Sequence, residues 1–155
     1  MSHDNQESHI ERRKTRDALA DFARTASGGR GQVALEEFND GLVLVFHLVP
    51  RNPRAVSVTV VCEQFLVVGI GTIGGRWELG YEEVSLAQRL IEAAIAGRVA
   101  EHFAPSRSRV DVSFPNGTTA SQTGVRGHEL PSPGRRVSTT WDRTIQYEPY
   151  GEGPS

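Results

Sequence analysis

The first predicted element is a helix over Ser8–Ala26, where apolar residues recur at helical spacing. These apolar positions are Ile10, Ala18, Leu19, Phe22, Ala23 and Ala26. Arginines on the other face are interleaved with acidic residues, which is the pattern of a solvated helix surface. The glycine-rich stretch Ser27–Gly31 should end this helix and act as a hinge.

The pattern then changes to the two-residue period of strands. We predict strands over residues 32–38, 42–49, 56–62 and 65–70. Asn39-Asp40-Gly41 predicts a tight hairpin turn between the first two. The second of these strands, Leu42–Val49, is apolar on both faces and is interrupted only by His47. Such a strand is typical of the middle of a sheet that is covered twice.

The clearest apolar stripe at helical spacing runs from Tyr81 to Phe103 and predicts a long helix over Glu82–Phe103. Acidic residues in its first turn and Arg98 and His102 in its last turns suit the helix dipole. A second hairpin follows, with Pro115-Asn116-Gly117 as its turn. Ile145–Tyr147 predicts one last short strand, and we expect the terminal YGEGPS to fray.

Together these elements predict an α+β fold. A mainly antiparallel sheet of about five to six strands would pack with the long helix and the N-terminal helix, one on each apolar face. Along the chain we expect a helix and glycine hinge at residues 1–30 and an α+β core at 31–123. A Pro/Gly/Arg-rich segment, partly docked, should occupy residues 124–155.

The stretch GIGTIGG at Gly69–Gly75 begins with the spacing G-x-G-x-x-G, but its surroundings do not fit a dinucleotide-binding loop. That loop places its third glycine in the start of a helix, whose amides hold the pyrophosphate. Here the alternating residues Arg76–Leu79 follow, which favour an extended segment. We therefore predict a bulge or hairpin between two strands, and no bound nucleotide or other cofactor.

Composition narrows the classes of protein to consider. The chain has 155 residues, a net charge of −2 and 37% hydrophobic residues, which favours one folded domain and gives no basic excess for nucleic acid. The most apolar region, residues 55–73, is broken by polar residues, so we predict no membrane span. One cysteine, Cys62, and an N-terminus without an apolar segment favour a reduced, cytoplasmic setting.

Residues that could carry chemistry are scattered along the sequence. The histidines lack metal-ligand spacing, so we predict no metal site, and we expect His47 to be a hydrogen-bonded core or edge residue. Cys62 lies in an apolar strand, where a thiol is usually inert. No nucleophile motif is present, so we assign no catalytic residue. These patterns indicate a binding protein, and an enzyme with a distributed site is the third hypothesis.

Acidic residues are concentrated in the body of the chain, which suggests a surface for a basic protein partner. We expect this surface on the hairpin at residues 36–41 and the segment at 76–78. Its residues would be Glu36, Glu37, Asp40, Arg76, Trp77 and Glu78. Trp77 has two interpretations: an exposed anchor of the interface, or a core residue that shares a face with Leu79.

Three segments, GRWELGYEE, IAGRVAEHF and RSRVDVSFPNGT, resemble small actinobacterial proteins that are similar to immunity proteins of polymorphic toxin systems. The resemblance covers about residues 31–123. It implies an α+β protein without catalytic activity that masks a toxin through a charged surface. The alternative is a small-molecule-binding or regulatory domain with a pocket under the glycine-rich hairpin.

The amount of apolar strand surface predicts association of the chain with itself. The strands at 42–49 and 65–70 offer more apolar surface than one helix can cover, and the N-terminal helix lies beyond a glycine hinge. We therefore expect a homodimer, in which that helix could reach a second subunit.

Overall fold

The computed structural model describes residues 3–125 and 141–151. Helix α1 spans His3–Ser27 and helix α2 spans Val84–Ile95. The strands are β1 Gly31–Phe38, β2 Val43–Pro50, β3 Val58–Cys62, β4 Leu66–Ile70, β5 Gly75–Leu79, β6 Val99–Ala104, β7 Arg107–Ser113, β8 Thr119–Val125 and β9 Arg143–Gln146. Short 3-10 turns precede β1, join β1 to β2, and lead into α2.

The strands form two antiparallel sheets rather than one. Strands β1 to β5 follow one another in a five-stranded sheet, and a four-stranded sheet has the order β8-β7-β6-β9. The α+β class and the five-stranded antiparallel sheet confirm the prediction. Both hairpins predicted from turn residues are present, because β1 pairs with β2 and β7 pairs with β8.

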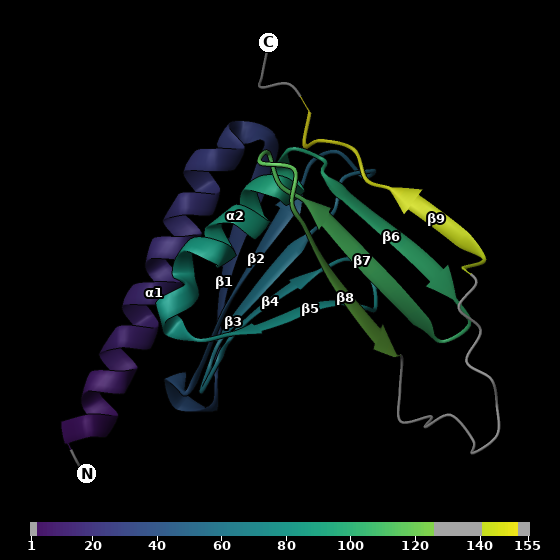
Figure 1. Cartoon of the computed structure of the whole chain (residues 1–155). Coiled ribbons are helices and arrows are strands. Elements are labelled where there is room, and N and C mark those ends of the chain that lie inside the picture. Colours follow the sequence, from purple (N-terminus) through teal and green to yellow (C-terminus); the bar gives the residue numbers. More distant parts are fainter. Residues whose placement is uncertain (1–2, 126–140, 152–155) are drawn as a thin grey trace, which may run out of the picture.

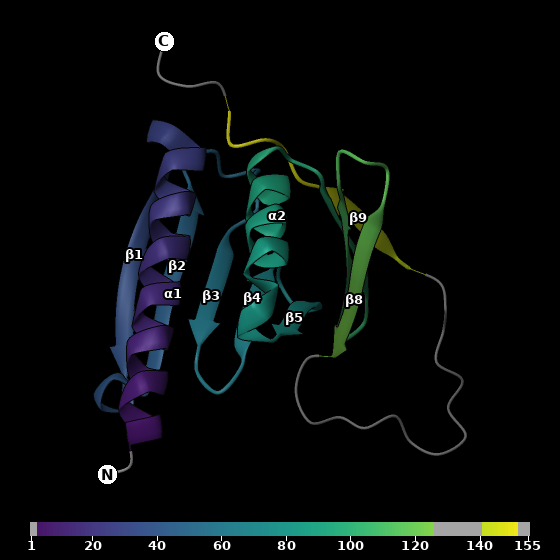
Figure 2. The same ribbon diagram turned by 60° about the vertical axis from the view of Figure 1, so that its left-hand side comes forward.

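Both helices lie on the same face of the five-stranded sheet, which corrects the expectation of one helix on each face. Figure 1 shows α1 and α2 on one side of β1–β5, and Figure 2 shows α2 between α1 and the four-stranded sheet. The helical face carries the fully buried side chains of β2 and β3, including Phe46 and Val60. Leu19 and Ala23 of α1 pack against them at 0% exposure, so α1 belongs to the core of its own chain.

The long predicted helix is shorter than expected, and its last part is a strand. Helix α2 ends at Ile95, and Val99–Ala104 forms β6. Gly97 makes the break because its φ is +75°, a left-handed conformation that side chains other than glycine rarely adopt. Its α-carbon also lies against the chain near Pro149, where a Cβ would come within 2.4 Å of the Pro149 nitrogen. His102 therefore lies in a strand and not at a helix end.

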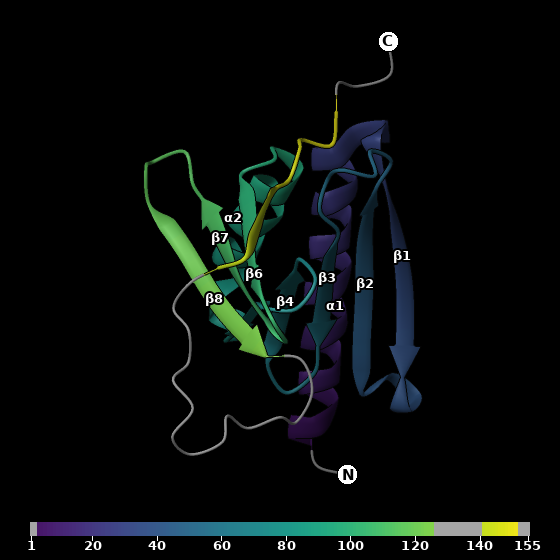
Figure 3. The same ribbon diagram turned by 90° about the vertical axis from the view of Figure 1, so that its right-hand side faces the viewer.

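The C-terminal residues 141–151 tie the two sheets together. In Figure 3 the yellow segment runs from β9 towards the C-terminal end of α1. The Tyr150 hydroxyl donates to the Val56 carbonyl at 2.8 Å, and Arg30 donates to the Gly151 carbonyl at 3.0 Å. Tyr150 is 2% exposed, so the expected fraying does not include this residue. Residues 152–155 of that stretch lie outside the described part of the chain.

Neither of the two helices in the described ranges, residues 3–125 and 141–151, has the length and apolar content needed to cross a membrane.

Candidate functional site

The five-stranded sheet has one face that no described element covers. Strand alternation sends the side chains of Leu44, Phe46 and Leu48 toward the helices, and it sends those between them to the other side. We call this second side the open face. Its central side chains form two rows that cross all five strands, and the pairing register of the strands defines each row.

The first row of the open face is apolar in the middle and acidic at both ends. The register places Glu36, Val45, Val61, Val67 and Glu78 side by side from β1 to β5. Val45 is 5% exposed and Val67 is 7% exposed, although no second layer lies over them in the described structure. The Glu36 and Glu78 side chains are 47% and 63% exposed, and Arg76 Nη2 lies 3.4 Å from the Glu78 carboxylate.

The second row is polar and runs through Ala34, His47, Thr59, Gly69 and Arg76. His47 Nδ1 and Thr59 Oγ1 share a hydrogen bond of 3.0 Å. His47 Nε2 lies 3.4 Å from the Glu36 carboxylate, which connects the two rows. His47 is thus hydrogen-bonded, as predicted, although it lies on the inner strand β2 and its side chain is partly exposed.

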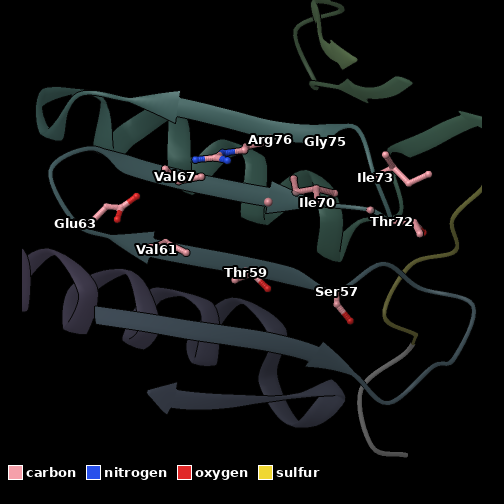
Figure 4. A pocket seen from close by; sticks show the side chains of 12 residues that line it. Ser57, Thr59, Val61, Glu63, Val67, Ile70, Thr72, Ile73, Gly75 and Arg76 are labelled. Atoms are coloured by element: carbon pink, nitrogen blue, oxygen red, sulfur yellow. The ribbon is translucent and has the colours of Figure 1, made fainter. Parts of the chain in front are cut away.

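A groove lies over β4, between β3 and β5, because Gly69 of the second row brings no side chain to it. Ser57, Thr59 and Val61 of the β3 side form one wall and Arg76 contributes to the other, as Figure 4 shows. The groove has a volume of about 420 Å³. A Cβ added at Gly69 would meet the Thr59 carbonyl oxygen at 3.6 Å, an ordinary contact. The bottom of the groove therefore has room for a side chain at position 69, where the chain has glycine.

The glycine-rich loop after β4 does hold an anion, but the anion is a carboxylate of the same chain. The backbone amides of Thr72 and Ile73 donate to the Glu101 carboxylate at 3.0 and 3.2 Å. The Ser108 and Tyr147 hydroxyls each donate to it at 2.6 Å. The loop is a hairpin between β4 and β5, as predicted, and its amides are occupied by Glu101 of β6.

Glu101 is fully buried, and its hydrogen bonds determine its charge state. Burial alone would raise the pKa of this carboxyl. The donors from Ser108, Tyr147, Thr72 and Ile73 together outweigh burial and lower the pKa below its ordinary value. Glu101 is therefore ionised at neutral pH, and it joins the four-stranded sheet to the β4–β5 hairpin.

A second polar cluster lies on the outer face of the four-stranded sheet. His102 Nε2 lies 2.9 Å from Asp111 Oδ2, and His102 Nδ1 lies 2.8 Å from Thr144 Oγ1. Ser121 and Arg109 also donate to Asp111. Burial would raise the pKa of Asp111, but these hydrogen bonds and the charge of Arg109 lower it.

A carboxylate, an imidazole and a hydroxyl in line can activate the hydroxyl as a nucleophile. Such a reaction also needs a protected site with donors aimed at the developing oxyanion. Thr144 is exposed on a sheet face. The carboxylate oxygens of Asp111 form hydrogen bonds with Ser121 and Arg109 as well as with His102. The contacts are those of a cross-strand polar ladder that stabilises pairing of β6, β7, β8 and β9.

The structure brings three of the six predicted surface residues to the open face. Glu36, Arg76 and Glu78 lie there, with Glu36 on β1 and the other two on β5. Glu37 faces α1, where Arg13 Nη1 donates to its carboxylate at 2.6 Å. The hydrogen bond from Arg13 and its charge lower the pKa of Glu37. Asp40 lies in the β1–β2 turn.

Trp77 is a core residue and not an exposed anchor. It is 5% exposed and belongs to the same apolar cluster as Leu79. Cys62 is also buried, and burial raises the pKa of its thiol to about 12, which keeps it protonated and unreactive. Within residues 3–125 and 141–151, no three His, Cys, Asp or Glu side chains come together as metal ligands would.

Comparisons of the chain with protein-family models, with curated proteins and with solved structures found no match.

The valine row and the role of Gly69 are not predicted by the sequence pattern. The signal was present, since Val45, Val61 and Val67 are among the apolar residues on the second face of strands whose first face is also apolar. That pattern predicts burial under a second layer. Strand register, which places these valines beside one another and between two carboxylates, becomes known only from the structure.

Proposed function

We propose that this protein is a non-enzymatic binding protein of the immunity type, and that a basic protein partner binds its open face. The observation that supports the proposal is the row of three valines between Glu36 and Glu78. An apolar centre with a charged rim is the usual anatomy of a protein interface. Carboxylates at both ends select a partner that carries basic groups on either side of an apolar patch.

The size of the open face favours a protein over a small molecule. The row crosses four inter-strand spacings, about 19 Å, which exceeds the reach of most single metabolites. Val45, Val61 and Val67 also come from three adjacent strands of one sheet, which suits a broad contact. The resemblance to immunity proteins supports the same mode of action, namely masking of a basic surface of the partner.

The groove supports a second candidate function, binding of a small molecule. Its volume of about 420 Å³ falls in the range of ligand sites. Thr59 and Arg76 would supply the polar groups that orient such a ligand. A thermal shift with a single metabolite, and no captured protein, is the result that would favour this candidate over the first.

The proposed function predicts that reversal of the two terminal charges abolishes partner capture. The test is affinity capture from a lysate of the source cells, with the wild-type chain and with a Glu36→Arg/Glu78→Arg bait. A captured protein is then purified, and its dissociation constant is measured by calorimetry at low and high salt. We expect the charge-reversed bait to bind at least tenfold more weakly, and the wild-type complex to weaken as salt rises.

The matched control reverses two charges on the covered side of the sheet. Glu11 on α1 and Glu92 on α2 are exposed and lie on the helices. The Glu11→Arg/Glu92→Arg bait has the same change in net charge and should bind like the wild type. Equal loss with both double variants, or capture that neither variant changes, would show that the open face is not the binding surface.

A further inference from the structure

Strand β1 forms a free edge of the five-stranded sheet. Within residues 3–125 and 141–151, the order β1-β2-β3-β4-β5 leaves one side of β1 unpaired, whereas β5 lies beside the four-stranded sheet. Figure 2 and Figure 3 both show β1 as the outermost strand. β1 is eight residues long and contains no proline or lysine, two residues that commonly keep a free edge from pairing, and its charged residues are Glu36 and Glu37.

The hydrogen-bond register identifies which backbone groups of β1 point outward. The Arg51 amide donates to the Arg30 carbonyl at 2.9 Å, so these two residues form a hydrogen-bonded pair at the start of the ladder. Because these pairs alternate along the ladder, the backbone N–H and C=O groups of the even-numbered residues of β1 point toward β2. Pro50 pairs with the odd-numbered residue Gly31, so the N–H that proline lacks is not needed for a hydrogen bond between β1 and β2. The N–H and C=O groups of Val33, Leu35 and Glu37 therefore point away from the sheet.

Exposed apolar side chains are concentrated around the same edge. Leu35 is 45% exposed on the helical side of β1, and Phe38 is 50% exposed on the open-face side. Leu42, just after the β1–β2 turn, is 48% exposed, and Ile10 of α1 is 56% exposed. Large apolar side chains beside a row of unpaired backbone groups indicate a surface that is covered in solution.

We propose that the free edge of β1 pairs antiparallel with β1 of a second copy of this chain, so that two five-stranded sheets become one continuous sheet. A two-fold axis through Ala34 pairs Val33 of each copy with Leu35 of the other. Both residues offer outward backbone groups, so each pair forms two hydrogen bonds. The free edge of β1 can therefore pair with the same edge of a second copy.

Charge supports a second copy as the occupant of this edge. In the same register Glu36 faces Gln32 of the other copy, and Glu37 faces Gly31. No carboxylate then lies opposite another carboxylate across the new ladder, which avoids a repulsion that destabilises strand pairs. The open faces of both copies lie on the same side of the joined sheet, because paired residues direct their side chains to the same face.

Leu35→Pro is the direct test, because proline removes an outward N–H and leaves the ladder between β1 and β2 intact. We measure mass by sedimentation from 1 to 100 μM, together with thermal unfolding by circular dichroism. The wild type should approach twice its chain mass of 17.0 kDa, and Leu35→Pro should remain monomeric with a folded spectrum. Leu35→Lys, which keeps the N–H but adds a charge at the edge, should raise the dissociation constant at least tenfold.

Two further variants separate pairing from folding. Ala34→Pro removes an N–H that bonds to β2, so it should lower the melting temperature, whereas Leu35→Pro should not. Glu92→Lys on α2 changes the charge far from the edge and should leave the dimer intact. A wild type that stays monomeric at 100 μM would overturn the proposal. A dimer that both Leu35 variants leave unchanged would overturn it as well.

Discussion

Truncation of Trp77 to alanine is expected to lower the free energy of unfolding by about 3–5 kcal/mol, the usual cost of removing a large aromatic side chain from a core. Trp77 is 5% exposed and pairs with Val68 across the β4–β5 ladder on the helical face of the sheet. The loss comes from the apolar contacts and from the cavity that remains. Urea unfolding of the purified variant measures it directly.

The matched control is Phe65→Ala, which removes an aromatic side chain directly before β4 that is 52% exposed. We expect this variant to lose less than about 1 kcal/mol. If Trp77→Ala unfolds at the same urea concentration as the wild type, the assignment of Trp77 to the core is wrong.

Replacement of Glu101 with glutamine should cost about 2–4 kcal/mol at neutral pH, since buried donors would lose a charged acceptor. The amide group of glutamine presents N–H where Thr72, Ile73, Ser108 and Tyr147 now donate to an oxygen. At least one of these donors, or the new N–H, would be left without a partner inside the protein. Urea unfolding compares the variant with Glu92→Gln, an exposed glutamate on α2 that should cost almost nothing.

The difference in unfolding free energy between the wild type and Glu101→Gln should change with pH in one direction only. The folded-state pKa of Glu101 is lowered, so its carboxylate stabilises the fold at pH values above the unfolded-state pKa of about 4.3. That contribution is lost as the pH falls through the lower, folded-state pKa. The gap in stability between wild type and Glu101→Gln should therefore be constant from pH 8 to 6 and close below pH 4. A gap that widens on acidification would contradict the direction of the shift.

Local signals in the sequence were sufficient for the hairpins and the class of fold. Asn39-Asp40-Gly41 and Pro115-Asn116-Gly117 predict turns whatever packs around them. The end of α2 was missed because Val99 and Phe103 lie four residues apart, a spacing that fits a helix face and equally one face of a strand. The decisive feature is Gly97, which takes a left-handed conformation where Pro149 approaches, and that contact joins residues far apart in the chain.

Each of the three positions in the G-x-G-x-x-G spacing is occupied by glycine for a different physical reason. Gly69 has space around it and leaves the groove open. Gly71 has a φ of +92°, and a Cβ there would come within 2.7 Å of the Glu101 carboxylate. At Gly74 a Cβ would come within 2.0 Å of the Ser108 carbonyl oxygen. The two later glycines allow the hairpin to approach the four-stranded sheet, and spacing alone could not reveal this role.

Glu101 illustrates why the sequence could not reveal the connection between the two sheets. In the sequence it is one acidic residue within an apolar stripe, and the donors that hold it come from residues 72–73, 108 and 147. Their convergence depends on how the two sheets pack. The open face was missed for a related reason, because an apolar second face predicts burial but does not say whether the cover is this chain or a partner.

The most direct test of the open face as the binding surface is the affinity of Gly69→Val for the captured partner, measured by calorimetry beside the wild type. Valine suits a strand, and its Cβ meets only ordinary contacts at this position, so the melting temperature should stay the same or rise. The side chain fills the groove between Thr59 and Arg76. The proposal predicts a dissociation constant at least tenfold higher than that of the wild type. Unchanged affinity in a fully folded Gly69→Val protein would contradict it.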